Sequence, residues 1–137
     1  MKNFSIDKDA DGILVVTFDM PDRSMNVLNV SSMSEIAELT EMIKSDKSIN
    51  GAVITSGKKA FCAGADLEEM GSNLSGARGE MKKDPEGAKA ELFKSVYKLN
   101  KLFRDLEVCG KPIAAALNGL ALGGGFEFVM ACTGRFI

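Results

Sequence analysis

Glu127 is the residue of this sequence whose surroundings best suit chemistry. It falls in the first turn of a helix that we expect over Gly124–Cys132, with apolar residues on both sides of it. We expect this carboxylate to be at least partly buried beside a glycine loop, where it could act as a general base or acid. A glutamate at a helix start also commonly does no more than stabilise the helix dipole, so the residue alone leaves both interpretations open.

Two loops could supply backbone donors close to Glu127. Gly123-Gly124-Gly125 stands between an expected strand and the helix, and Phe61–Asp66 follows another strand. Glycine lets a backbone N–H approach a ligand closely, so one N–H from each loop could hold an oxyanion without any ionisable side chain. Each loop is also compatible with a tight turn that binds nothing, and a loop such as Phe61–Asp66 taken alone is more often just a turn. Neither has the spacing of a dinucleotide or P-loop fingerprint, which makes a nucleotide-binding module the weaker alternative.

The composition of the 137 residues excludes several classes of site. There is no histidine, which removes Ser-His-Asp and Cys-His nucleophiles and histidine-ligated metals. Cys62, Cys109 and Cys132 form no CxxC pair, so we expect buried free thiols in a reducing cytoplasm and no metal site. A net charge of −2 without a basic tract argues against nucleic-acid binding. No apolar stretch is long and uninterrupted enough to span a bilayer.

A layered α/β scaffold is expected to position these residues. The sequence predicts a hairpin between Phe4–Ile6 and the buried strand Ile13–Phe18, with a further strand at Gly51–Thr55. A helix fits Ser32–Asp46, because Ser32 and Glu35 have the spacing of a capping box before an apolar face of helical period. From local pattern alone, Asp66 is interpreted as a capping and solvated charge.

The middle of the chain is predicted to hold one long helix. A short helical piece at Leu67–Met70 precedes Gly71–Lys83, whose polar, glycine-rich composition we interpret as a mobile surface loop. Asp84 then caps the long helix, with Pro85 at its first position. Its apolar stripe consists of Leu92, Val96, Leu99, Phe103 and Leu106.

The expected element order is ββ-α-β-α-β-α-β, with parallel strand pairing across each helical crossover. Ile113–Leu117 supplies a strand after the long helix, and Arg135–Ile137 begins another. We expect residues 1–137 to form a single domain that is truncated at its C-terminus, since a last strand without a covering helix leaves an apolar sheet face open.

Two segments together resemble the crotonase, or enoyl-CoA hydratase/isomerase, superfamily. They read AFCAGADLEEM over Ala60–Met70 and KPIAAALNGLALGGGFE over Lys111–Glu127. The Met25–Asn29 turn extends the resemblance toward the N-terminus, so that it covers the whole chain. This part of the chain is similar to the hydratase module at the front of multifunctional fatty-acid oxidation proteins, in their α subunit.

The resemblance implies a crotonase-like ββα spiral fold, present here as its N-terminal portion. It implies an oxyanion hole made by the N–H groups of Ala65 and Gly124, which would hold the thioester oxygen of an acyl-CoA. Glu127 matches one of two hydratase glutamates. The coenzyme A thioester is then the substrate, and no separate cofactor or metal is expected. The residues that the resemblance places at coenzyme A are Lys58, Lys59, Ala63, Asp66 and Leu67.

Some features of the family lie outside this chain or differ from it. The second hydratase glutamate would fall beyond Ile137, and Phe126 is bulkier than the small residue often found beside the first. The resemblance implies a homo-oligomer, trimer-based in the family, or part of a fatty-acid oxidation complex. Three alternatives stay open: a 2-enoyl-CoA hydratase, a Δ3-Δ2 enoyl-CoA isomerase, and a non-catalytic acyl-CoA-binding fragment that lacks the second glutamate.

Overall fold

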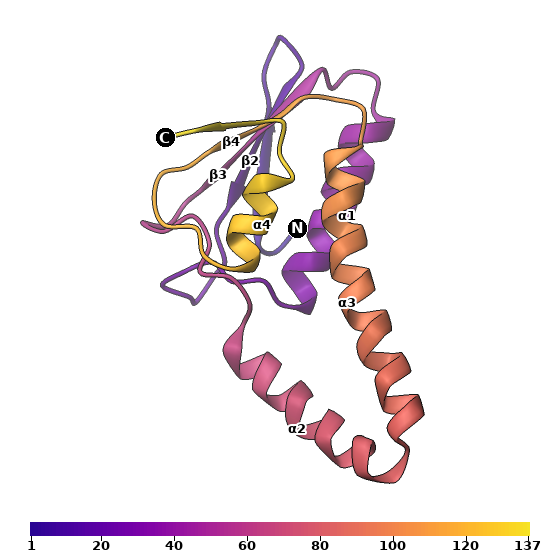
Figure 1. Cartoon of the computed structure of the whole chain (residues 1–137). Coiled ribbons are helices and arrows are strands. Elements are labelled where there is room, and N and C mark those ends of the chain that lie inside the picture. The colour runs from indigo at the N-terminus through magenta and orange to yellow at the C-terminus, as the bar shows by residue number, and fades with distance from the viewer.

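A five-stranded sheet in the order β1-β2-β3-β4-β5 forms the centre of the computed structural model (Figure 1), which describes residues 1–137 except for the side chain of Leu74. The first two strands are antiparallel, and each later pair is parallel. The strands are β1 (Phe4–Lys8), β2 (Ile13–Phe18), β3 (Gly51–Ser56), β4 (Ile113–Ala116) and β5 (Gly134–Phe136). The predicted hairpin and the parallel crossovers are therefore confirmed.

Helices connect the parallel strands. The connections run through α1 (Val30–Ser45), then α2 (Leu67–Lys83) with α3 (Pro85–Glu107), and finally α4 (Gly124–Met130). In Figure 1, α1, α4 and the last part of α3 lie beside the sheet, whereas α2 and the first part of α3 extend away from it. The expected order of strands and helices is confirmed apart from the length of α2.

The core lies between the sheet and these helices. Leu14, Val16 and Phe18 of β2 are buried, as the two-residue period of a strand requires for one face. The ring of Phe128 in α4 lies 6.2 Å from that of Phe61 and 6.1 Å from that of Phe103 in α3. Burial of these aromatic rings fixes α4 against both the loop after β3 and the end of α3.

The start of α1 differs from its prediction. Asn29 is the N-cap: its side chain accepts a hydrogen bond from the Ser32 N–H at 2.9 Å, while Ser32 Oγ accepts from the Asn29 N–H at 3.0 Å. The proposed capping box of Ser32 with Glu35 is wrong. Glu35 instead accepts the backbone N–H groups of Lys2 and Asn3, at 3.0 and 2.9 Å, and so anchors the N-terminal residues to α1.

The segment Gly71–Lys83 is helical, and its interpretation as a mobile loop is wrong. It continues the predicted short helix as α2, capped by Asp66. The first turn carries acidic residues and the last turn carries Lys82 and Lys83, which matches the helix dipole at both ends. The cap and these charges offset the cost of three glycines in the helix interior.

The apolar stripe of α3 is buried along only part of its length. Phe103 and Leu106 are buried and Leu99 is half-buried, but Leu92 and Val96 are exposed. The projecting half of α3 lies beyond the edge of the sheet (Figure 1), so the same helical face meets a core at one end and solvent at the other.

Within the described part of the chain, no helix is both long enough and apolar enough to cross a membrane. Cys62, Cys109 and Cys132 are buried and unpaired there, as predicted.

Candidate functional site

The two glycine-containing loops lie against each other. The N–H groups of Phe61 and Cys62 both donate to the Leu120 carbonyl, at 2.9 and 3.2 Å, and the Leu122 N–H donates to the Cys62 carbonyl at 3.0 Å. This short parallel ladder joins the loop after β3 to the loop after β4, because the two strands are themselves neighbours in the sheet. The two loops are therefore in contact, as a shared oxyanion site would require.

A third segment, Asn26–Leu28, holds the other side of the first loop. The Ala63 N–H donates to the Asn26 carbonyl at 2.9 Å, and the Leu28 N–H donates to the Gly64 carbonyl at 2.7 Å. The Asp66 N–H in turn donates to the Leu28 carbonyl at 2.9 Å. The loop that carries Ala65 is therefore bonded on both of its edges.

These contacts determine the direction of the Ala65 N–H. The Gly64 carbonyl and the Ala65 N–H belong to one planar trans peptide group, so they point in opposite directions. Since the carbonyl is bonded to Leu28, the N–H faces away from that segment. It donates to no acceptor among the described residues, and Ala65 is exposed.

The same argument applies to Gly124. The Gly123 carbonyl accepts the N–H groups of Phe126 and Glu127, at 2.9 and 3.0 Å, and therefore points into α4. The Gly124 N–H shares that peptide plane and points out of the helix start. In the part of the chain that the structure describes, it too has no acceptor.

Glycine is required where the loops approach most closely. Gly64 has a φ of +94°, and a Cβ built there would lie 2.8 Å from the Leu122 carbonyl oxygen and 3.6 Å from the Gly124 nitrogen. A Cβ at Gly125 would lie 2.6 Å from the Cys62 carbonyl oxygen. Side chains at either position would push the loops apart, so these glycines serve the contact that brings the two free N–H groups near each other.

Glu127 lies in α4 as predicted, but the expectation that it is at least partly buried beside the glycine loop does not match its exposed position. Its side chain is exposed and lines an open groove of about 550 Å³ between α3 and α4, together with Phe103, Phe126 and Met130. The two apolar neighbours of Glu127 that suggested burial, Phe126 and Phe128, lie on opposite sides of α4. Phe128 points into the core, whereas Phe126 is 52% exposed.

The residues assigned to coenzyme A by resemblance have different surroundings. The Lys58 ammonium pairs with Asp19 at 2.7 Å, and Lys59 is exposed. Ala63 is half-buried in the loop ladder, and Leu67 is 73% exposed at the start of α2. All five residues follow β3 in the chain, and one of the two lysines is already paired.

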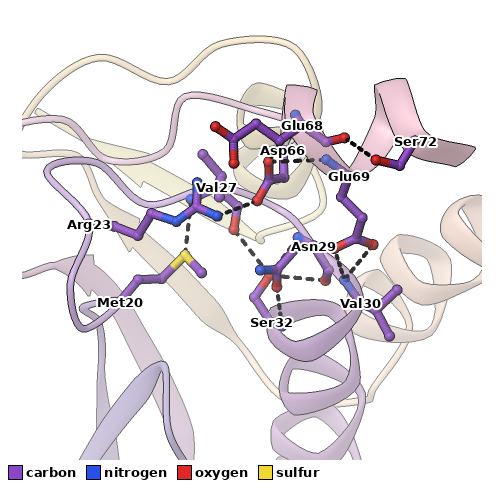
Figure 2. A network of polar contacts seen from close by, with 10 residues as sticks. All are labelled: Met20, Arg23, Val27, Asn29, Val30, Ser32, Asp66, Glu68, Glu69 and Ser72. Atoms are coloured by element: carbon purple, nitrogen blue, oxygen red, sulfur yellow. Dashed lines mark hydrogen bonds and ion pairs between the residues drawn. The ribbon is translucent and has the colours of Figure 1, made fainter.

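Asp66 is not a solvated charge, in contrast to its local interpretation. Only 5% of its side chain is exposed. It accepts the N–H groups of Glu68 and Glu69 at 3.1 and 3.4 Å, and Arg23 at 2.8 Å (Figure 2). The predicted capping role is confirmed, and the carboxylate also joins α2 to the loop before α1.

Two residues of this network were not singled out by their local sequence. Arg23 pairs with Asp66 across 43 positions, and Asn26 is fully buried behind the loop. For Asn26, the available signal in the sequence was its position as a polar residue within the Met25–Asn29 turn. For Arg23 no local signal existed, because a single arginine in a turn is usually solvated.

The thiol nearest the ladder is that of Cys62. Burial raises its pKa, and a backbone hydrogen bond from Gly64 offsets part of this effect. The neutral thiol is a poor nucleophile, so Cys62 contributes packing to the site.

Comparisons with known proteins cover all of the loops and helices that form this site. The sequence model for the family described as enoyl-CoA hydratase/isomerase matches residues 8–135. The chain belongs to this family. The resemblance stated from the two motifs is therefore confirmed.

Two curated relatives are α subunits of fatty acid oxidation complexes, from Pseudomonas syringae pv. tomato and Acinetobacter baumannii. Each is 36% identical to the chain over 126 residues, which is 92% of this chain and 16% of the relative. The chain thus spans about one sixth of the length of these relatives.

Solved structures of the family have the same fold. An enoyl-CoA hydratase/carnithine racemase from Magnetospirillum magneticum is 29% identical with a TM-score of 0.76, covering 98% of this chain and 46% of its own. An enoyl-CoA hydratase from Bacillus anthracis is 26% identical with a TM-score of 0.74, covering 97% and 46%. The crotonase-like α/β fold is confirmed, as a portion of the fold in those proteins.

Proposed function

We propose that the chain is part of an enoyl-CoA hydratase-type module of fatty-acid β-oxidation. The observation that carries the proposal is the pair of N–H groups of Ala65 and Gly124. They come from two loops in contact, each is aimed by the carbonyl of its own peptide group, and neither donates to another described residue. Membership of the hydratase/isomerase family and the α-subunit relatives support the same chemistry.

In this proposal the two N–H groups bind the thioester oxygen of a 2-enoyl-CoA. A base takes a proton from water as the water oxygen bonds to C3, and the C2=C3 electrons move to the thioester as an enolate. The two donors stabilise that developing negative charge, and a proton added at C2 completes the product. Glu127 performs one of these proton transfers, and a second carboxylate outside residues 1–137 performs the other.

Coenzyme A would lie along Lys58, Lys59, Ala63, Asp66 and Leu67. The Lys58 ammonium must leave Asp19 to meet a phosphate, and Asp66 acts through the backbone that it caps. The thioester is the substrate, and no separate cofactor takes part. Residues 1–137 form part of one domain that works as a homo-oligomer or within a fatty-acid oxidation complex, and the names of the relatives support the second alternative.

A Δ3-Δ2 enoyl-CoA isomerase is the second candidate. Such a reaction needs a single carboxylate, which takes a proton from C2 and returns it at C4 while the same enolate oxygen is held. The position of Glu127 in the groove beside α3 is compatible with this simpler chemistry. A non-catalytic acyl-CoA-binding fragment is the outcome if neither reaction occurs.

The proposal is tested by the absorbance of the enoyl-thioester band after crotonyl-CoA is mixed with a protein that carries this chain together with the second carboxylate. We expect a fall that Glu127→Gln reduces by about 100-fold or more, within the range of general acid–base catalysis. Glu107→Gln is the matched control, because Glu107 lines the same groove but pairs with Arg104. Turnover of 3-enoyl-CoA alone would favour the isomerase. Binding without either reaction would contradict both enzymes.

A further inference from the structure

Asn26 is the most completely bonded buried side chain near the site. None of its surface is exposed. Its Oδ1 accepts the Met20 N–H at 2.9 Å, while its Nδ2 donates to the Phe18 carbonyl at 2.7 Å, to Ser56 Oγ at 2.9 Å and to the Phe61 carbonyl at 3.2 Å. The side chain thus joins the ends of β2 and β3 to the start of the first glycine-containing loop.

The backbone of the same segment controls the far end of that loop. The Asn26 carbonyl accepts the Ala63 N–H, and two residues further on Leu28 bonds the Gly64 carbonyl and the Asp66 N–H. The Leu28–Gly64 bond sets the peptide plane from which the Ala65 N–H projects. Whatever fixes the segment Asn26–Leu28 against the sheet therefore also fixes the direction of the Ala65 N–H.

We propose that Asn26 is a positioning residue for the Ala65 N–H, holding the loop by its side chain and its backbone together. This inference rests on the proposed function, in which that N–H binds the thioester oxygen. Preorganised donors stabilise a developing charge only when their direction is set before the reaction. The buried Asn26 side chain bonds the backbone at Phe18, Met20 and Phe61, and so ties these three positions to the segment that sets the direction of the N–H.

Asparagine suits this position because the site needs an acceptor and two donors on one short side chain. An apolar residue of similar size would leave the Met20 N–H and the carbonyls of Phe18 and Phe61 without this partner in a buried place, which is costly. An aspartate would bring a carboxylate against the same carbonyl oxygens. Asn26→Ala is the substitution chosen for the test, because alanine removes all four side-chain hydrogen bonds of Asn26 and adds no new repulsion.

The first experiment measures backbone amide hydrogen exchange in Asn26→Ala, without ligand. We expect exchange at Leu28, Ala63 and Asp66 to become at least tenfold faster, while the amides paired between β2 and β3 keep their rates. Asn50→Ala is the matched control, because Asn50 donates one side-chain hydrogen bond, to the Asp11 carbonyl, at the opposite end of the sheet. Unchanged rates at the three amides would overturn the inference.

If Asn26→Ala does not fold, Asn26→Ser carries the same comparison, since serine retains one hydroxyl that can donate and accept at this position. A smaller acceleration confined to the same three amides supports the inference. A uniform acceleration across the sheet overturns it, because Asn26 would then serve general stability alone.

The second experiment uses a cinnamoyl-CoA thioester, whose absorption moves to longer wavelength when its carbonyl oxygen accepts strong hydrogen bonds. The spectrum is recorded at saturation, so that weaker binding is separated from weaker polarisation. We expect the wild-type shift to be lost in Gly124→Pro and at least halved in Asn26→Ala. A full shift in Asn26→Ala overturns the inference alone. No shift in the wild type, or a full shift in Gly124→Pro, overturns the proposed oxyanion hole as well.

Discussion

Each proposed oxyanion donor is aimed by the partner of its own carbonyl. The Gly64 carbonyl is bonded to Leu28, and the Gly123 carbonyl is bonded inside α4. The two N–H groups of Ala65 and Gly124 therefore hold their directions without a ligand. A backbone site of this kind needs no ionisable side chain and is sensitive to anything that turns a peptide plane.

Gly124→Pro tests a single donor at this scale. Proline at the first position of a helix is compatible with the backbone, but it removes the N–H. We expect kcat for crotonyl-CoA to fall by about 10²–10³-fold, the usual effect of losing one oxyanion donor. Gly124→Ala is the control, because it adds the same Cβ, 2.9 Å from the flexible end of Leu28, and keeps the N–H. Equal losses in both variants would contradict the donor role.

Cys132 gives a prediction for the pH dependence of stability. Burial raises the pKa of its thiol from an ordinary value of 9.0 to about 12, with Cys109 adding to the rise and Arg135 opposing it. The unfolded thiol ionises first as the pH rises, so the unfolded state binds fewer protons and stability falls above pH 9.

Between pH 8 and pH 10, the free energy of unfolding that depends on Cys132 should fall by about 1.4 kcal/mol, the value of one pKa unit. Urea unfolding of the wild type and of Cys132→Ala at both pH values measures it. The variant should lose less stability over this interval than the wild type. Parallel losses would show that this thiol is not shifted.

At the scale of elements, α2 and the first loop are joined through their shared boundary. Asp66 ends the loop, caps α2 and pairs with Arg23, while Glu69 in the first turn of α2 accepts the Val30 N–H at 3.2 Å (Figure 2). The starts of α1 and α2 are thus held together on the side of the loop that faces Leu28. A movement of α2 would be transmitted to Ala65 through Asp66.

Glycine has opposite consequences in the loop contact and in α2, which two matched substitutions can separate. At Gly125 an added Cβ meets the backbone and side chain of Cys62 at less than its van der Waals distance, whereas at Gly71 nothing lies within 4 Å. We expect Gly125→Ala to lower the free energy of unfolding by about 1–3 kcal/mol. Gly71→Ala should raise it by about 0.5–1 kcal/mol through better helix propensity. Thermal unfolding followed by circular dichroism measures both, and the same sign for the two would contradict the loop contact.

The whole molecule consists of a packed part around the sheet and a projecting helical hairpin made by α2 and the first half of α3 (Figure 1). Both parts carry aromatic side chains. Phe103 is 8% exposed and stacks on Phe128, whereas Phe93 is 71% exposed and stacks on Tyr97 along the helix. The same helix therefore contributes to the core at one end only.

Alanine at these two positions should have very different effects. Phe103→Ala removes a buried ring and is expected to cost about 3–5 kcal/mol of the free energy of unfolding. Phe93→Ala should change it by no more than about 0.5 kcal/mol, as for a surface substitution. Chemical denaturation of both variants measures this. Comparable losses would mean that the projecting half of α3 is buried in solution.

The sequence by itself determined the elements whose cause is local. The hairpin, the buried strands with their two-residue period, the Asp84 cap with Pro85, and the glycine loops after β3 and after β4 all follow from nearest neighbours in the chain. Parallel pairing of adjacent strands then places the two loops together, because the ends of neighbouring strands meet at one edge of the sheet.

Only the tertiary structure decided which polar groups meet across long separations. Asn26 donates hydrogen bonds to Ser56 and Phe61, Arg23 pairs with Asp66, and Glu35 accepts from the N-terminal backbone. Contacts of this kind produce no periodic pattern in the sequence. It also decided that Glu127 is exposed, because burial depends on what lies opposite a helix face and not on the residues beside it in the chain. A hydrogen bond between distant residues is specified by geometry that only the packed sheet and helices create.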